Sequence, residues 1–349
     1  MKNTSLKNTL LNNILITGGA GFIGSNFVLY FAKKYPHYRI FNVDSLTYAG
    51  DLQNLKGIEA CENYTFLQGD ICDRDFISEI FARHEIDGVI HLAAESHVDN
   101  SIANPSAFIQ TNVNGTFNLL HAAYSQWFCA PHIPREHKRH CVFHHISTDE
   151  VFGSLGDSGY FTESTPYAPN SPYSASKASS DMLVRAYFHT YGLQTLITNC
   201  SNNYGPKQHD EKLIPTIIRN ALRGSAIPIY GDGKNVRDWL FVEDHCRALD
   251  VVFHSKCYGE TFNIGGNCEL TNIEIAHRIC ALLDSMKPKG WSYREQIAFV
   301  QDRAGHDRRY AIDSSKIAKI LGWKPQESFE VGLEKTLRYY VERYGGSIC

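Results

Sequence analysis

Tyr173 and Lys177 are four residues apart, a spacing at which two side chains share one face of a helix. An ammonium beside the phenol lowers the pKa of the phenol, so that a tyrosinate can take a proton from a sugar hydroxyl. Thr148 can donate a hydrogen bond to the same oxygen. Taken alone, Tyr and Lys at this spacing are more often a solvent-facing pair. Together with Thr148, they suit the oxidation of an alcohol by a nicotinamide cofactor.

Asp149 and Glu150 follow Thr148 directly and add a second kind of chemistry. One carboxyl can act as an acid and the other as a base, so the pair can eliminate water from an oxidised sugar. Opposite duties at one pH require separated pKa values, and we expect a drier setting to keep Asp149 protonated. The alternative is an acidic turn or a helix cap. An ordinary dehydrogenase has no need for this pair.

Gly18, Gly21 and Gly24 stand directly after a short apolar run, residues 13–17. In a dinucleotide-binding loop the first glycine makes the turn and the second lets the backbone approach the pyrophosphate. The third permits close packing of helix on strand, and the helix N-terminus faces the negative charge. A glycine-rich tight turn is the alternative. The position after the first strand favours a dinucleotide site.

Asp44 ends the second expected strand and fits hydrogen bonding to the hydroxyls of the adenosine ribose. A carboxylate at this place repels a 2′-phosphate, so NAD is favoured over NADP. Asp70 and Ile71 end the next strand and can frame the adenine. A simple capping role for Asp70 is a real competitor.

Alternating strand and helix patterns must position these residues. We expect strands at residues 13–17, 39–43, 64–67, 89–94, 141–146 and 195–198, and helices at 25–34, 104–125 and 174–191. This alternation predicts an α/β fold with a Rossmann-type doubly wound parallel sheet. After Asn199, Pro and Gly interrupt the pattern, which predicts a smaller C-terminal substrate-binding lobe over the carboxyl edge of the sheet. We place the Rossmann domain at 1–200 and the lobe at 201–349, with the segment around 238–266 returning to the first domain.

The composition of the 349 residues narrows the function classes further. A net charge of −3 does not indicate the positively charged surface that binds nucleic acid, so nucleic acid is not expected as a partner. The ten cysteines fall singly with no C-x-x-C, which indicates reduced thiols in the cytoplasm. We expect neither a signal peptide nor a membrane span. His132, His137 and His140 lack tight ligand spacing, and we interpret them as a solvated loop, with no metal expected.

The combined motifs identify the chain as a member of the short-chain dehydrogenase/reductase superfamily, in its extended branch. Within it, residues from about 13 to 340 resemble the dTDP-glucose 4,6-dehydratase family. The motifs that carry the resemblance are LAAESHVD at 92–99, HHISTDEV at 144–151, SPYSASK at 171–177, NCSNNYGP at 199–206, RDW at 237–239 and GHDRRYA at 305–311. Two positions depart from the family pattern: Asn100 replaces an Arg and Ala304 replaces a Pro. Neither touches the catalytic set; Asn100 changes the local charge near the cofactor, and Ala304 relaxes a loop expected to hold the nucleotide.

The resemblance implies a set of binding residues. Its cofactor contacts correspond to Phe22, Ile23, Asp44, Ser45, Leu46, Thr47, Asp70, Ile71, Leu92, Ala93, Ala94, Glu95, Ser96, Thr111, Tyr173, Lys177 and Asn203. Its sugar-nucleotide contacts correspond to Ser96, Thr148, Asn202, Lys212, Leu213, Pro228, Ile229, Tyr230, Arg237, Asn272, Asp302, Arg303, Ala304, Gly305 and His306. Arg237, Asn202 and His306 are suitable donors to a diphosphate.

The family's reaction would convert dTDP-glucose to dTDP-4-keto-6-deoxyglucose, a hydro-lyase step in rhamnose-type deoxysugar biosynthesis, with bound NAD as cofactor. Tyr173 would take the C4 hydroxyl proton, Glu150 the C5 proton, and Asp149 would protonate the departing C6 hydroxyl. The family also implies a homodimer built on helices around 108–124 and 178–191.

Three rival functions are open. A sugar-nucleotide 4-epimerase of the same fold would not use the Asp149–Glu150 pair. Dehydratases acting on GDP-mannose, CDP-glucose or UDP-sugars would differ mainly in the base pocket. A cofactor-sensing regulatory protein would be expected to have lost Tyr173 or Lys177, and both are present.

Overall fold

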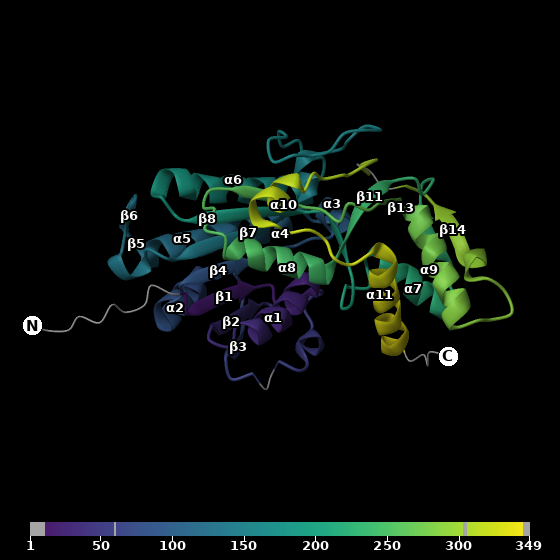
Figure 1. The fold of residues 1–349 in the computed structure, drawn as a ribbon, viewed down its shortest axis with the longest axis horizontal. Helices are drawn as coiled ribbons and strands as arrows, with labels where there is room; N and C mark the ends of the chain where they lie inside the picture. Colours follow the sequence, from purple (N-terminus) through teal and green to yellow (C-terminus); the bar gives the residue numbers. More distant parts are fainter. Residues whose placement is uncertain (1–10, 59–60, 303–305, 345–349) are drawn as a thin grey trace, which may run out of the picture.

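A seven-stranded parallel sheet forms the centre of the molecule (Figure 1). The computed structural model describes residues 11–58, 61–302 and 306–344. The strand order is β12-β8-β7-β4-β1-β2-β3, and each neighbouring pair is parallel. The strands span β1 (Asn13–Thr17), β2 (Arg39–Asp44), β3 (Tyr64–Gln68), β4 (Gly88–His91), β7 (Val142–Thr148), β8 (Thr195–Cys200) and β12 (Thr261–Ile264). The predicted doubly wound Rossmann-type sheet is confirmed.

Helices cover both faces of this sheet, which is why its strands are apolar runs rather than alternating ones. On one face, α1 (Phe22–Lys34) packs on α8 (Val242–Phe253), and both belong to one apolar core. On the other face lie α2 (Arg74–His84), α5 (Thr116–Trp127) and α6 (Pro172–Tyr191). The remaining short elements of this part are α3 (Val98–Ala103), α4 (Pro105–Phe108), β5 (Phe128–Ala130), β6 (Ile133–Pro134) and α10 (Ser315–Leu321).

The helix expected at 104–125 is not one regular helix. A π-helical stretch, Ile109–Gly115, separates α4 from α5, which continues to Trp127. The carbonyl of Asn112 in this stretch accepts hydrogen bonds from the hydroxyls of Thr116 and Ser180, at 2.5 and 2.6 Å. Two side-chain hydroxyls therefore bind a backbone carbonyl inside the π-helical stretch. Such bulges are frequent at functional sites.

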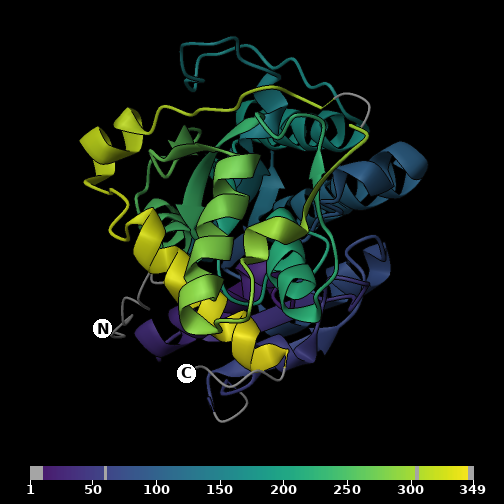
Figure 2. The ribbon, with the colours of Figure 1, turned by 90° about the vertical axis from the view of Figure 1, so that its right-hand side faces the viewer.

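A second group of elements has its own apolar core and lies beside the carboxyl edge of the sheet (Figure 2). Its strands are β9 (Asn202–Tyr204), β10 (Ile227–Tyr230), β11 (Val236–Phe241), β13 (Glu269–Thr271) and β14 (Ile297–Val300). Its helices are α7 (Leu213–Arg223), α9 (Asn272–Met286) and α11 (Phe329–Arg343). The chain between β11 and β13 leaves this lobe to form α8 and β12 of the main sheet.

Among the described residues, none of the helices combines the length and the apolar character that crossing a membrane requires.

Candidate active site

A cavity of about 330 Å³ lies where the strands of the main sheet end. Its walls come from the loops after β1, β2, β3, β4 and β7, from α6, and from the lobe residues Asn202, Asn203 and Lys212. Ligands of open α/β sheets bind at this edge. The cavity thus brings segments far apart in the sequence to one place.

The glycine loop shapes one end of the cavity. Gly18 has φ of +74°, and a Cβ there would lie 2.6 Å from the amide nitrogen of Ala93. At Gly24 a Cβ would lie 2.0 Å from the carbonyl oxygen of Gly18, so only glycine lets α1 pack this close to the loop. At Gly21 a Cβ would meet only the carbonyl oxygen of Gly18, at an ordinary contact distance of 3.4 Å, and Gly21 lines the cavity. The first turn of α1 has no acidic residue, and its amides can receive a pyrophosphate.

Asp44 lies at the end of β2 with its carboxylate fixed by backbone amides. Oδ2 accepts from the amide of Ala20 and Oδ1 from the amide of Leu46, both at 2.8 Å. Each carboxylate oxygen keeps a further lone pair for a ribose hydroxyl. The fixed negative charge disfavours a phosphate at the same place, as expected for an NAD site.

The cavity contains all five predicted catalytic residues. Thr148 ends β7, Asp149 and Glu150 start the following 3₁₀ turn (Asp149–Phe152), and Tyr173 and Lys177 lie on α6. The Thr148 hydroxyl accepts from the Glu150 amide at 3.2 Å and lies 3.4 Å from Asp149 Oδ1. It also hydrogen-bonds the Tyr173 phenol. Redox-type and elimination-type side chains therefore share one chamber.

Asp149 is in the drier setting that the acid role requires. It is 2 % exposed, and Oδ2 has no hydrogen-bond partner among the described residues. Burial raises the pKa of Asp149 well above its ordinary value, and the carboxylates of Glu150 and Asp238 act in the same direction. Arg237 and the Thr148 hydroxyl oppose this rise. The result is a carboxyl that holds its proton.

The pKa of Tyr173 differs from the expectation that Lys177 lowers it. Burial raises the pKa of the Tyr173 phenol well above its ordinary value, and the Glu150 carboxylate raises it further. The Lys177 ammonium donates to the carbonyl oxygen of Ile146 at 2.7 Å. Its own pKa is lowered by burial to about 8. Protein charges alone therefore do not produce a tyrosinate at this site.

The structure places nearly all of the predicted cofactor residues in the cavity wall. They are Gly18, Gly21, Phe22, Ile23, Gly24, Asp44, Ser45, Thr47, Asp70, Ile71, Leu92, Ala93, Ala94, Glu95, Ser96, Thr111, Tyr173, Lys177 and Asn203. Leu46 does not line the cavity; it adopts φ of +53° and its amide supports Asp44.

The predicted sugar-nucleotide residues fall into two groups. Ser96, Thr148, Asn202 and Lys212 line the cavity, and Lys212 donates to the carbonyl oxygen of Ser96 at 3.0 Å. Outside the cavity wall are Leu213, Pro228, Ile229, Tyr230, Arg237, Asn272, Asp302 and His306. Arg303, Ala304 and Gly305 lie outside the described residues.

Within the second group, His306 Nδ1 lies 2.6 Å from Asp302 Oδ1, and the His306 ring is near that of Tyr230, with centroids 6.5 Å apart. Arg237 donates to the carbonyl of Asp307 at 3.0 Å and stacks over Tyr310 at 4.3 Å. Ile229 is 1 % exposed in the lobe's core, so its side chain is not available to a ligand.

Sequence reasoning missed several residues that support the site. Asn112 is buried and its side chain binds both the amide and the carbonyl of Glu95, at 2.8 and 3.0 Å, and Ser176 at 2.8 Å. Ser147, Gln208 and Glu211 line the cavity. Ser147 could have been predicted from its place near the carboxyl end of a strand. Nothing in the local pattern around Asn112 indicates a role at the site.

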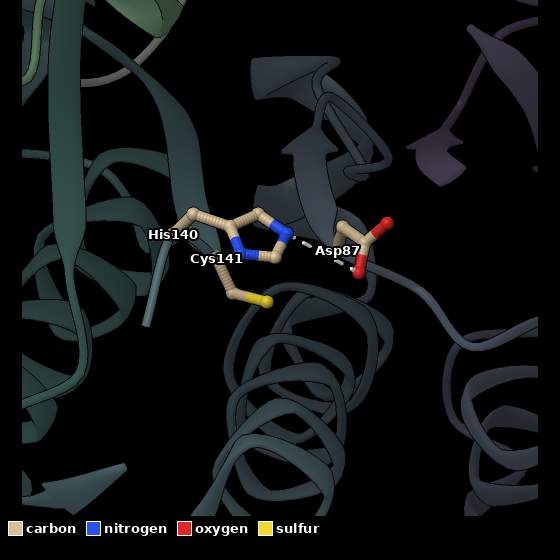
Figure 3. A group of neighbouring side chains, drawn as sticks. All are labelled: Asp87, His140 and Cys141. Atoms are coloured by element: carbon tan, nitrogen blue, oxygen red, sulfur yellow. Dashed lines mark ion pairs between the residues drawn. The ribbon is translucent and has the colours of Figure 1, made fainter. Parts of the chain in front are cut away.

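One group of metal-ligand types occurs among the described residues, away from the cavity. Asp87, His140 and Cys141 lie together at the amino ends of β4 and β7 (Figure 3). The Lys138 ammonium lies 2.7 Å from Asp87 Oδ1 and already compensates this carboxylate. Two backbone amides occupy its other oxygen. We therefore interpret the group as an ion-pair cluster.

Comparison with known proteins places this geometry in context. The profile of the GDP-mannose 4,6-dehydratase family matches residues 15–336. A dTDP-glucose 4,6-dehydratase of Shigella flexneri is 56% identical over 337 residues, which covers 94% of this chain and 92% of that protein.

Two solved structures are also close. A dTDP-glucose 4,6-dehydratase of Bacillus anthracis in complex with NAD is 46% identical, with a TM-score of 0.83 over 95% of this chain and 97% of that one. Its counterpart from Streptomyces venezuelae, also with NAD bound, is 45% identical, with a TM-score of 0.85 over 95% and 98%. These identities over nearly the whole chain, and the five predicted catalytic side chains together in one cavity, show that the chain belongs to the dTDP-glucose 4,6-dehydratase family.

Proposed function

We propose that this protein is a hydro-lyase that converts dTDP-glucose to dTDP-4-keto-6-deoxyglucose in deoxysugar biosynthesis of the rhamnose type. The observation that carries the proposal is the buried, proton-holding Asp149 beside Glu150, in the same cavity as Thr148 and Tyr173. Oxidation alone would need Thr148 and Tyr173 but not the two carboxyls. The close relatives named as dTDP-glucose 4,6-dehydratases support the choice of substrate.

NAD fits the cavity of this chain. Gly21 in the cavity wall, the uncapped amides of α1 and the fixed Asp44 carboxylate match its pyrophosphate and ribose. Bound NAD supplies the transient oxidation at C4 and the later reduction at C6. Its cationic nicotinamide would also lower the pKa of the Tyr173 phenol, which protein charges alone leave raised.

The chain's own residues divide the proton transfers. Tyr173 takes the C4 hydroxyl proton, assisted by the hydrogen bond from Thr148. The ketone then acidifies the C5 proton, which Glu150 removes. Asp149, protonated because it is buried, donates to the departing C6 hydroxyl, and water leaves. The proton on C5 is finally restored, so the net change is the loss of water.

We assign substrate recognition to residues on the cavity wall and to residues that lie beyond it. Asn202 and Lys212 on the wall, with Arg237 and His306 beyond it, offer donors to the diphosphate, and Tyr230 offers a face or a hydroxyl to the base. Asn100, where the family has Arg, is a hydrogen-bond partner of Tyr48 next to Glu95. Its neutral side chain alters the charge near the cofactor end of the cavity.

We further propose a cytoplasmic homodimer with the domain division at residue 200 given above. Phe117 on α5 and Met182 on α6 are 40 % and 50 % exposed, and these two helices pack side by side. An antiparallel copy of the pair would cover both side chains in a four-helix interface. The free cysteines of the described residues suit a reducing compartment.

The test is incubation of the purified protein, with no NAD added, with separate samples of dTDP-glucose, UDP-glucose, CDP-glucose and GDP-mannose. Mass spectrometry should show the loss of one water from dTDP-glucose, because the cofactor is regenerated in each turnover. A strict need for stoichiometric NAD, or an epimer of unchanged mass, would contradict the proposal. Preference for another nucleotide would refute the assignment of the base.

A further inference from the structure

We infer that Asp181 is the buried counter-ion of Lys177, and that it keeps the ammonium charged over the pH range in which the C4 hydroxyl is oxidised. The inference deepens the proposed function and rests on it for its kinetic consequence. Asp181 does not line the catalytic cavity, so it acts through Lys177 as a positioning residue.

The side chains of Tyr173, Lys177 and Asp181 lie on one face of α6, because they are spaced by four residues. All three are buried, and Asp181 is 1 % exposed. A buried carboxylate is costly unless it is paired and hydrogen-bonded. The neighbours of Asp181 meet part of that cost: burial raises the pKa of Asp181 to about 6, so that the carboxyl is ionised at pH 7 to 8, and Oδ1 has no hydrogen-bond partner among the described residues.

Two hydroxyls and a ring surround the Asp181 carboxylate. Ser147 donates to Oδ2 at 2.8 Å and Tyr167 donates to the same oxygen at 2.9 Å. On the other side, His145 Nε2 lies 3.2 Å from Oδ1 and 3.5 Å from Lys177 Nζ. The imidazole is therefore placed between the carboxylate and the ammonium. Hydroxyl donors stabilise the ionised form of a carboxyl.

The other titratable groups that face Lys177 are neutral near pH 7. They are Tyr173 on its own helix, His91 on β4, His145 on β7 and Cys200 on β8. Burial lowers the pKa of both histidines well below the ordinary range and raises the pKa of the Cys200 thiol to about 12. Within the described part of the chain, Asp181 thus supplies the negative charge that acts on Lys177.

This charge decides whether Lys177 is protonated at the pH of the cell. Burial alone lowers the pKa of Lys177, and Asp181 acts in the opposite direction, giving a value of about 8. Without Asp181, the pKa of Lys177 would fall further and the amine would be neutral near pH 7.5. A neutral amine could not help to stabilise the Tyr173 phenolate.

The matched variants are Asp181→Asn, which removes the charge and keeps the shape, and Tyr167→Phe, which removes one hydrogen bond and keeps the charge. Asp181→Ser serves as a second neutral variant if Asp181→Asn does not fold, and Asp181→Glu restores the charge. The direct readout is a nuclear magnetic resonance titration of protein labelled with ¹³Cε-lysine, in which Lys177→Met identifies the Lys177 signal.

We expect the Lys177 signal to titrate near pH 8 in the wild-type protein. Its midpoint should move down by at least about one pH unit in Asp181→Asn and by less than about 0.3 in Tyr167→Phe. Equal midpoints in wild type and Asp181→Asn would overturn the inference. This readout needs no substrate, so it stands or falls independently of the proposed reaction.

The kinetic readout is the rate of nicotinamide reduction in a single turnover with dTDP-glucose, each variant being made in a Glu150→Gln background. Above pH 8, Asp181→Asn should be about tenfold slower, which is one pKa unit, and near pH 6 its rate should be within about twofold of the background. A uniform loss at every pH would indicate a merely structural role and refute the inference. If the Lys177 resonance shifts as expected but no nicotinamide is reduced with dTDP-glucose, the proposed function is refuted instead.

Discussion

At the scale of single residues, Asp149 combines burial with an oxygen that has no described hydrogen-bond partner. Its folded pKa is raised above the ordinary 3.8, so the folded protein binds a proton that the unfolded chain releases. Folding stability therefore falls as pH rises from the unfolded towards the folded pKa. Burying the carboxyl that acts as the acid therefore lowers the folding stability of the protein.

Asp149→Asn should thus stabilise the protein while it abolishes dehydration. We expect a gain of about 2 kcal/mol or more at pH 8, because asparagine does not need to bind a proton on folding, and a smaller gain near pH 4.5. Thermal unfolding at the two pH values measures the difference. The exposed Asp157→Asn serves as control, with an expected effect below about 0.5 kcal/mol. A destabilised Asp149→Asn protein would show that the carboxyl is not strained by burial.

A second prediction separates oxidation from elimination. Tyr173→Phe removes the group that takes the C4 proton, so both oxidation and dehydration should fall by about 10²–10⁴. Glu150→Gln leaves Tyr173, Thr148 and Lys177 in place, so reduced nicotinamide should accumulate in a single turnover while solvent deuterium does not enter C5. Absorbance and mass spectrometry check the two outcomes. If Glu150→Gln with an intact fold and full NAD content shows no reduction, the division of roles is wrong.

At the scale of elements, the junction between β1 and α1 gives a matched pair of substitutions. A Cβ at Gly24 would overlap the carbonyl of Gly18, whereas a Cβ at Gly21, in the cavity wall, would only touch that carbonyl at 3.4 Å. Gly24→Ala should cost about 1–3 kcal/mol of folding stability through overpacking. Gly21→Ala should leave the NAD-free protein near wild-type stability and weaken NAD binding by about tenfold or more. Calorimetry on both variants tests this; similar NAD affinity in Gly21→Ala and wild type would argue against a pyrophosphate at this loop.

The sequence predicted the elements whose pattern is local and strong. The strand at 13–17 depends on a buried apolar run and the helix at 174–191 on its periodicity, and the structure has both within two residues. The sequence did not predict the π-helical stretch, in which the Asn112 carbonyl accepts from the hydroxyl of Ser180 on α6, a contact that no local pattern reports. The lobe strands β9, β10 and β14 were not predicted either, because they pair with segments far away in the sequence.

The candidate site was predicted to a similar degree. Residues in contiguous motifs, such as Thr148 to Glu150, were found together in the cavity. The raised pKa of Tyr173 was not foreseen, because it depends on burial that the helix spacing does not report. Asp181, His145 and Tyr167 lie in three separate segments, and only the packing of α6 on β7 makes them one network.

At the scale of the whole molecule, the exposed faces of α5 and α6 test the proposed dimer. Phe117→Glu combined with Met182→Glu places charges on this apolar face and should convert a dimer to a monomer in sedimentation at micromolar concentration. Val331→Glu, on the exposed face of α11, is the control and should leave the mass unchanged. A wild-type monomer, or a dimer that survives the double substitution, would exclude this interface.

The chain passes from the main sheet to the lobe and back again, and this limits how such a protein can be recombined in evolution. The main sheet takes β12 and α8 only after the chain has built β9 to β11 elsewhere, and the chain then returns to add β13 and α11. A gene fragment ending near residue 200 would leave β8 paired with β7 only, without β12, and α1 without α8, so Phe31 would lose its contact with Phe253. A single genetic crossover therefore cannot exchange the lobe without also exchanging α8 and β12 of the main domain. New sugar specificities on this scaffold are expected to arise by point changes in its loops rather than by shuffling of modules.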